Sequence, residues 1–430
     1  MKGRRATAGG VESGRPVIGA RHTRGGPGTP GVESTRDCFA VTTPGFESVV
    51  ALEVSALGAV PGAPESGGVA FRANDAQLFS ANLHLRAASR VLVRIASFKA
   101  KSFAELERRA KAILWKSYVR ANGSVAFRVT CRKSRLYHSD AVAERLAKSL
   151  LAQIPRATML ATTGKPADDS RDDTADGAEP TAPGAAAGPA TQLFVVRFEH
   201  DVCTISADSS GELLHRRGYR KATAKAPIRE TIAAGVLLSL GYDGADPLLD
   251  PMCGSGTFAI EAALIARNIA PGAARSFACE AWPSFDRGVS GRVRSAALTA
   301  QRPSAAAPIV ASDRDAGAIA AARANAERAG VSGDVTFTQC ALSAIVAPAG
   351  AGLLVANPPY GLRVGESGAL RDLYAQIGNV TRAKLAGWRV ALISADRKLE
   401  AQARLPFADE VRFSNGGIKV RLVATPARRG

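Results

Sequence analysis

The sequence is poor in cysteine and in aromatic residues, and it has no long apolar run. Its six cysteines are scattered over 430 residues without a Cys-x-x-Cys pair, which argues against a disulfide framework and a zinc site. The longest apolar run, near Thr231 to Leu240, is too short to cross a bilayer, and the N-terminus has no apolar signal core. These absences predict a cytoplasmic protein without a metal or a membrane partner.

Negative charge is scarce as well. Lysine and arginine total 56 against 38 acids, a formal net charge of +18. Several of the acids lie together in one predicted linker, so the folded parts are more basic still: Asp168, Asp169, Asp172, Asp173, Asp176 and Glu179. This balance favours a polyanionic partner, although a generally arginine-rich proteome would give the same charge. The length allows two or three domains and does not set an oligomeric state.

Two stretches are expected to stay outside the folded core. Residues 1–36 are rich in Gly, Arg and Pro without a hydrophobic period, which predicts a disordered basic tail. The tail could touch RNA or be a passive extension. Residues 161–190 consist mostly of Ala, Gly, Pro, Thr and Asp, which predicts a flexible acidic insertion. Around this insertion, residues 37–210 alternate between predicted strands and helices, as in an α+β region.

Two basic segments are candidates for contact with RNA. The first is a turn that follows the predicted strand Ser124 to Cys131 and carries Tyr137 among its cations: Arg132, Lys133, Arg135 and His138. The second, from Leu213 to Ala222, places a tyrosine among cations that include Arg216, Arg217 and Arg220. Cations suit phosphates and a ring suits base stacking. The alternatives are a solvated charge cluster for the turn, and a connector held by acidic partners for the second segment.

The stretch around which the chain is organised is Pro247 to Ala263. A short apolar strand ends at Asp250, a loop with two glycines follows, and an apolar helix begins, so the backbone can approach a ligand closely. The predicted ligand contacts are Asp250, Pro251, Cys253, Gly254, Ser255, Gly256 and Thr257. The loop lacks the third glycine of the dinucleotide fingerprint and the Gly-Lys-Ser/Thr of a triphosphate loop, so alone it is a weak signal.

A second stretch, about a hundred residues further on, strengthens the interpretation. The buried strand Gly352 to Ala356 leads into Asn357-Pro358-Pro359-Tyr360. In open α/β sheets, ligands bind at the carboxyl ends of such strands. The pair of motifs resembles class I S-adenosylmethionine-dependent methyltransferases that act on planar exocyclic amines. Asp-Pro-Met-Cys-Gly-Ser-Gly-Thr resembles the bacterial RNA guanine-N2 branch of that class.

The resemblance covers roughly Phe39 to Val423 apart from the insertion. It implies a Rossmann-like α/β domain over residues 211–430, a doubly wound sheet with a terminal antiparallel hairpin. Residues 37–210 are expected to form a ferredoxin-like and THUMP RNA-binding region. The THUMP likeness, over about Phe71 to Leu151, rests on the Ala88 to Val93 stretch, on scattered aromatic residues and on the Ser134 to Ser139 segment.

The resemblance also assigns roles to residues. Asp313, after the second strand, is expected to accept the ribose hydroxyls of S-adenosylmethionine, or else to be a helix N-cap, while Asp315 interacts with the helix dipole. The Asn357 oxygen and the Pro358 carbonyl can accept the two N–H groups of an amine, and Tyr360 can stack on its base. Two positions depart from the family: Ala341 stands where an acid usually holds adenine, and Leu362 replaces the glutamate of Gly-Glu-Arg.

The predicted function is methyl transfer to the exocyclic N2 amine of a guanine in RNA, with 23S ribosomal RNA as the expected substrate. Transfer-RNA guanine-N2, DNA adenine-N6 and protein glutamine-N5 methylation also suit Asn-Pro-Pro-Tyr, but the predicted RNA-binding half argues against the last two. A non-catalytic RNA-binding or assembly factor that retains the fold is the alternative from another class.

Overall fold

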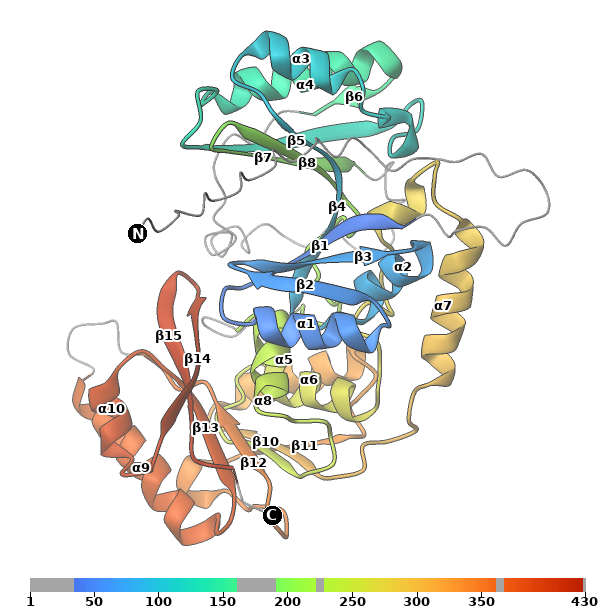
Figure 1. Cartoon of the computed structure of the whole chain (residues 1–430). Coiled ribbons are helices and arrows are strands. Elements are labelled where there is room, and N and C mark those ends of the chain that lie inside the picture. Colours follow the sequence, from blue (N-terminus) through green and yellow to red (C-terminus); the bar gives the residue numbers. More distant parts are fainter. Residues whose placement is uncertain (1–34, 161–190, 222–227, 361–366, 428–430) are drawn as a thin grey trace, which may run out of the picture.

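Two mixed β-sheets divide the chain, as the computed structural model in Figure 1 shows. The structure describes residues 35–160, 191–221, 228–360 and 367–427. The predicted tail up to residue 34, the acidic insertion 161–190 and the position of Leu362 lie outside these ranges. Within them, no helix is long and apolar enough to cross a membrane.

The first sheet has eight strands in the order β2-β3-β1-β4-β8-β7-β5-β6. Its strands are β1 Arg36–Thr42, β2 Val60–Glu65, β3 Gly68–Ala73, β4 Ala88–Lys99, β5 Ser124–Arg132, β6 Thr158–Met159, β7 Gln192–Glu199 and β8 Val202–Asp208. The helices of this half are α1 Glu47–Ala56, α2 Asp75–His84, α3 Phe103–Ala110 and α4 Ser139–Gln153, with the 3-10 turn η1 Trp115–Ser117.

The long strand β4 joins the two parts of this half. It pairs with β1 on one side and with β8 on the other, so the ferredoxin-like part and the β5–β8 part share one sheet. In the β5–β8 part, Trp115 is fully buried and its ring lies 5.0 Å from that of Phe194 and 5.9 Å from that of Phe127. Edge-to-face contacts of this kind fix one face of the sheet against its helices.

The second sheet has seven strands in the order β11-β10-β9-β12-β13-β15-β14. Its strands are β9 Leu248–Asp250, β10 Ile309–Asp313, β11 Val335–Gln339, β12 Leu353–Ala356, β13 Arg389–Ser394, β14 Ala408–Asn415 and β15 Ile418–Ala424. Its helices are α5 Glu230–Ser239, α6 Thr257–Ala266, α7 Arg287–Thr299, α8 Ala316–Arg328, α9 Ser367–Lys384 and α10 Arg397–Gln402, with the 3-10 turns η3 Ala278–Ala281 and η4 Leu342–Ala344. The first five strands run parallel, and β15 pairs antiparallel with β13 and β14.

The predicted fold class is confirmed: a doubly wound sheet ends in an antiparallel hairpin and is preceded by an α+β half. The sequence analysis missed β2, β6, α7 and α10. Strand β2 reads Val-Pro-Gly-Ala-Pro-Glu, which has little strand propensity. It forms at the edge of the sheet, where a proline removes no ladder bond that a neighbour needs.

Candidate active site

The glycine loop and the Asn357 tetrapeptide open onto the same edge of the second sheet. Strands β9 and β12 are parallel neighbours, with Leu248 opposite Leu353 and Leu249 opposite Leu354. Their carboxyl ends therefore lie side by side, at the point where the strand order reverses. Ligands of open α/β sheets bind at such a point. The expected meeting of two segments about a hundred residues apart is confirmed.

The glycine loop is tightly built. Gly254 and Gly256 have φ angles of 53° and 84°, in the left-handed region that favours glycine. A Cβ on Gly256 would lie 3.0 Å from the Cβ of Ala322 in α8, so a larger residue would push the loop away from that helix. The N-terminus of α6 follows at Thr257. Loop and helix together leave backbone close to whatever ligand binds there.

Asp250 ends strand β9 as a buried carboxyl group. Its Oδ1 atom accepts a hydrogen bond from the Met252 backbone at 3.3 Å, whereas Oδ2 has no hydrogen-bond partner among the described residues. Burial raises the pKa of Asp250 to about 8, and the charge on Asp313 adds to the shift. A carboxyl group with one unpartnered oxygen can accept a hydrogen bond from a ligand N–H group, and a cationic ligand beside it would favour the ionised carboxylate.

Asp313 joins the loop to the second strand. Its Oδ2 atom accepts from the Gly254 backbone at 3.0 Å, and its Oδ1 atom accepts from the Asp315 backbone at 3.0 Å. Helix α8 is capped by Asp315, which accepts from Gly317 and Ala318, so the alternative that Asp313 is the N-cap is wrong. Each carboxylate oxygen of Asp313 retains a second lone pair that can accept a hydroxyl.

The remaining loop side chains are buried. Cys253 is 7% exposed, and burial raises the pKa of its thiol, which therefore stays protonated. The Thr257 hydroxyl accepts from Arg220 at 3.1 Å, and the Ser255 carbonyl accepts from Asn325 at 3.0 Å. Near Ala341, where the family has an acid, two polar side chains could reach adenine instead. Gln339 donates to the Arg314 carbonyl at 3.3 Å, and Ser343 is exposed.

The tetrapeptide forms a hydrogen-bonded cluster with the C-terminal hairpin. The Tyr360 hydroxyl donates to the Oδ1 atom of Asn357, and the side-chain amide of Asn415 donates to that same hydroxyl at 3.1 Å. Burial raises the pKa of the Tyr360 phenol, which is therefore neutral. Asn415 ends strand β14 and is 8% exposed. The stretch Asn415-Gly416-Gly417 predicts a turn and does not mark Asn415 as a site residue, because its partner lies 55 positions away.

The predicted RNA-binding turn is exposed. The side chains of Arg132, Lys133, Arg135 and His138 all lie at the surface. Tyr137 is 69% exposed, with its ring 4.0 Å from that of His138. The backbone of the turn is fixed, since Arg135 donates from its backbone to Asp201 at 2.8 Å and Ser134 donates to the Arg132 carbonyl at 2.8 Å. Within the described residues, Arg132, Lys133 and Arg135 form no ion pair.

The turn continues into one face of the first sheet. The register places Thr130 beside Arg197 and Arg197 beside Thr204, which is itself beside Ser97. Arg128 lies one row further in, on the same side as Arg94. In Figure 1, α3 and α4 cover the opposite face of β5 and β7. The face therefore gathers cations that the sequence analysis did not connect: Arg94, Lys99, Arg128, Arg132 and Arg197. It also carries Glu199, in the row of Arg132 and Lys99, and Arg94 lies 3.8 Å from Glu65.

The second basic segment is a connector rather than a surface. Arg217 is 5% exposed, its Nε atom lies 3.5 Å from the fully buried carboxylate of Glu261, and it donates to the Arg86 carbonyl at 2.6 Å. Tyr219 is 3% exposed and donates to Glu261 at 3.0 Å. The prediction that Arg217 contacts RNA, with this ring available for stacking, is wrong because internal partners occupy both.

The neighbours of Arg217 differ in whether their side chains are paired inside the protein or exposed. Arg220 pairs with the buried Glu230 at 3.0 Å and donates to the Ile228 carbonyl at 2.6 Å, so its predicted RNA contact is wrong as well. Burial and the surrounding arginines lower the pKa of His215 to about 2, which leaves it neutral. Only Arg216, of the three arginines predicted here, has an exposed side chain. The alternative of a connector held by acidic partners describes the rest.

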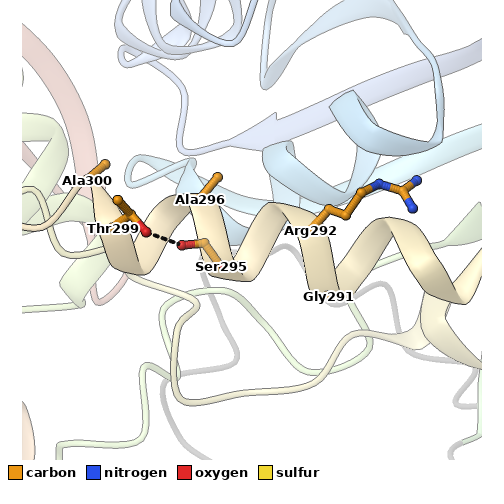
Figure 2. Close-up of a pocket in the computed structure, with 6 residues that line it drawn as sticks. All are labelled: Gly291, Arg292, Ser295, Ala296, Thr299 and Ala300. Carbon is orange, nitrogen blue, oxygen red and sulfur yellow. Dashed lines mark hydrogen bonds between the residues drawn. The ribbon is translucent and has the colours of Figure 1, made fainter.

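An open concavity lies on helix α7 (Figure 2). Its lining consists of Gly291, Arg292, Ser295, Ala296, Thr299 and Ala300. Arg292 is the sole charged residue in that lining, and none of the predicted site residues takes part. The α7 concavity is therefore separate from the edge of the sheet where Asp250 and Asn357 lie.

A parallel sheet with a reversal of strand order, a glycine loop on one side of the reversal and Asn-Pro-Pro-Tyr on the other define a class I S-adenosylmethionine-dependent methyltransferase. Known proteins agree with this class. The family model described as RMKL-like, methyltransferase domain, matches residues 217–424, and the RlmL ferredoxin-like domain matches residues 37–92. The chain belongs to the RMKL-like methyltransferase family, as the sequence resemblance predicted.

Individual relatives cover most of the chain. A Synechocystis sp. protein, provisionally named an RNA methyltransferase, is 33% identical over 91% of this chain and 96% of its own length. The ribosomal RNA large subunit methyltransferase K/L of Syntrophotalea carbinolica is 32% identical over 90% of this chain, which spans 53% of that longer protein. The crystal structure of SMU.472, a provisionally named methyltransferase complexed with SAH, has a TM-score of 0.78 at 29% identity and covers 92% of this chain and 99% of its own.

Proposed function

We propose that the protein transfers a methyl group from S-adenosylmethionine to the exocyclic N2 amine of a guanine in large-subunit ribosomal RNA. The observation that carries the proposal is the shared edge of the sheet, where Asp250 and the glycine loop adjoin Asn357. The names of the K/L relatives support ribosomal RNA as the substrate.

The residues at this edge fit the cofactor. The free buried oxygen of Asp250 suits the ammonium group of the methionine moiety, and the Asp313 carboxylate suits the ribose hydroxyls. The glycine loop permits close backbone approach. S-adenosylmethionine supplies an activated methyl group on a sulfonium.

The chain's own contribution is to position the amine. An aryl amine is a poor nucleophile because its lone pair is delocalised into the ring. The Asn357 oxygen and the Pro358 carbonyl accept its two N–H groups, Pro359 stiffens the loop, and Tyr360 stacks on the base. Holding the nitrogen in line with the methyl group provides most of the rate, so no general base is needed to begin the transfer.

RNA is held by the turn from Arg132 to His138 and by the cations of the adjoining sheet face. Alternate residues along a strand lie on one face about 7 Å apart, so cations at such positions form a row that can neutralise successive phosphates. Exposed Tyr137 offers a ring for stacking at the end of this track. Arg216 is the remaining cation of the connector that RNA can reach.

Two amine acceptors suit guanine N2 and adenine N6 alike. A solved structure from Listeria monocytogenes, described as a predicted N6-adenine-specific DNA methylase, matches this chain at 30% identity and a TM-score of 0.76. Nucleoside mass spectrometry of RNA treated with the protein separates the two, because the products are N2-methylguanosine and N6-methyladenosine. A non-catalytic assembly factor would give neither product, and calorimetry would detect no heat of S-adenosylmethionine binding.

The test of the mechanism is Asn357→Ala. We expect it to abolish methyl transfer to unmethylated large-subunit ribosomal RNA while the RNA affinity stays within a few fold of the parent. Asn122→Ala, at an exposed position outside the site, is the matched control and should leave both quantities unchanged. A variant at position 357 that keeps full turnover would remove Asn357 from the mechanism.

A further inference from the structure

The cluster of Asn357, Tyr360 and Asn415 has a fixed direction of hydrogen bonding. A phenol has one proton to donate, and here Tyr360 gives it to the Oδ1 atom of Asn357. The oxygen of Tyr360 must therefore act as an acceptor toward Asn415, whose amide N–H donates to it at 3.1 Å. The chain of donors runs from the C-terminal hairpin through the ring to the catalytic asparagine.

This direction makes Asn357 a shared acceptor. The proposed substrate amine approaches the same Oδ1 atom that accepts from the Tyr360 hydroxyl, and an amide oxygen has two lone pairs, so both can bind at once. The position of the Tyr360 hydroxyl then decides which lone pair stays open to the amine, while its ring must lie flat against the base. The Asn415 amide holds that hydroxyl in place, because it donates to the same oxygen.

We propose that Asn415 is a positioning residue for methyl transfer: it holds the Tyr360 ring in place while Asn357 accepts from both the tyrosine hydroxyl and the substrate amine. The inference rests on the proposed function. Its setting favours a fixed anchor, since Asn415 is 8% exposed and pairs with Ile418 across the β14–β15 hairpin. The Asn415 side chain hydrogen-bonds to the Tyr360 hydroxyl, so it acts on the reaction through Tyr360.

A double-mutant cycle tests the proposal. The readout is the single-turnover rate of methyl transfer from radiolabelled S-adenosylmethionine to unmethylated large-subunit ribosomal RNA transcribed in vitro. We expect Asn415→Ala to lower this rate about tenfold at saturating RNA, with the half-saturating RNA concentration changed less than threefold. Tyr360→Phe should lower it by a similar factor. In the Tyr360→Phe background, Asn415→Ala should then change the rate by less than twofold, because the bond is already lost.

A general effect on the hairpin would behave differently. Loss of hairpin structure would multiply with Tyr360→Phe, and two independent tenfold losses in the cycle would overturn the proposal. Asn415→Asp keeps the size of the side chain and removes the donor, so a full rate in this variant would overturn it too. Lys419→Ala, exposed on the same hairpin, should leave the rate unchanged. Absence of methyl transfer to this RNA by the parent protein would instead refute the proposed function itself.

Discussion

Arg216 and Arg217 are adjacent in sequence and are expected to respond in opposite ways to substitution by alanine. Arg217 has a side chain that is 3% exposed and faces a carboxylate of Glu261 that is 0% exposed. Removing one partner of a buried ion pair costs about 3–5 kcal/mol because the other charge is left uncompensated. Glu261 keeps its hydrogen bond from Tyr219 at 3.0 Å, so the lower end, about 3 kcal/mol, is expected for Arg217→Ala.

Thermal melting followed by circular dichroism measures this loss. For a chain of this size, about 3 kcal/mol corresponds to a fall of about 4 °C in the melting temperature if the chain unfolds cooperatively. Arg216→Ala should leave the melting temperature unchanged and weaken RNA binding, because its side chain is exposed. Arg217→Leu combined with Glu261→Gln should recover part of the loss, since neither charge then remains buried.

The reverse pattern would refute the assignment of Arg217 to the interior. If Arg217→Ala melted within about 1 °C of the parent and bound RNA more weakly than Arg216→Ala did, the connector would have to be an RNA-binding surface. Measuring both properties for both variants keeps the two explanations apart.

Three further predictions concern the RNA-binding turn and the cofactor edge. Neutralising Arg132, Lys133 and Arg135 should reduce the slope of log affinity for RNA against log salt by about 2, at roughly 0.7 for each phosphate that is no longer neutralised; an unchanged slope would return the turn to the solvated-surface interpretation. The pKa of Asp250 is raised to about 8 from an ordinary value near 3.8, so its contribution to stability is full below about pH 4 and is lost as the pH rises to about 8. The melting temperature of Asp250→Asn relative to the parent should therefore increase between about pH 5 and pH 8, and a constant difference would contradict the buried, protonated carboxyl group. Gly256→Ala should destabilise the fold by about 1–2 kcal/mol in thermal melts and weaken S-adenosylmethionine binding in calorimetry, because an alanine is strained at φ 84° and meets Ala322; parental affinity and stability would show that the loop tolerates a side chain.

The sequence predicted the parts of the site that depend on local pattern. Short apolar strands followed by a glycine loop or by Asn-Pro-Pro-Tyr carry their own signal, and parallel strands bring their carboxyl ends to one edge. Asp315 was predicted as a charge at the helix N-terminus, and the structure makes it the N-cap, the role that the sequence analysis had offered to Asp313. Strand β2 was not, since its prolines and glycine oppose strand structure and only its edge position permits it.

What the sequence could not provide are partnerships across long separations. A cluster of arginines next to a tyrosine is the same sequence pattern whether RNA phosphates or buried carboxylates neutralise the arginines. Glu261 lies 42 positions after Tyr219, inside an apolar helix where no pattern marks it as a partner. Asn415 sits in a hairpin whose sequence predicts a turn, and its contact with Tyr360 depends on how β14 and β15 extend beyond the sheet.

Strand β4 fixes the distance between the two ends of the sheet in the N-terminal half. Its twelve residues span about 40 Å, with β1 paired at one end and β8 at the other. The ladder of backbone bonds along this strand, which has a bulge between Arg94 and Ala96, limits bending between the two ends. A substrate that docks far from the chemistry must therefore place its target nucleotide at a fixed distance from the docking surface. The dimensions of an RNA, as well as its bases, then decide whether it is selected.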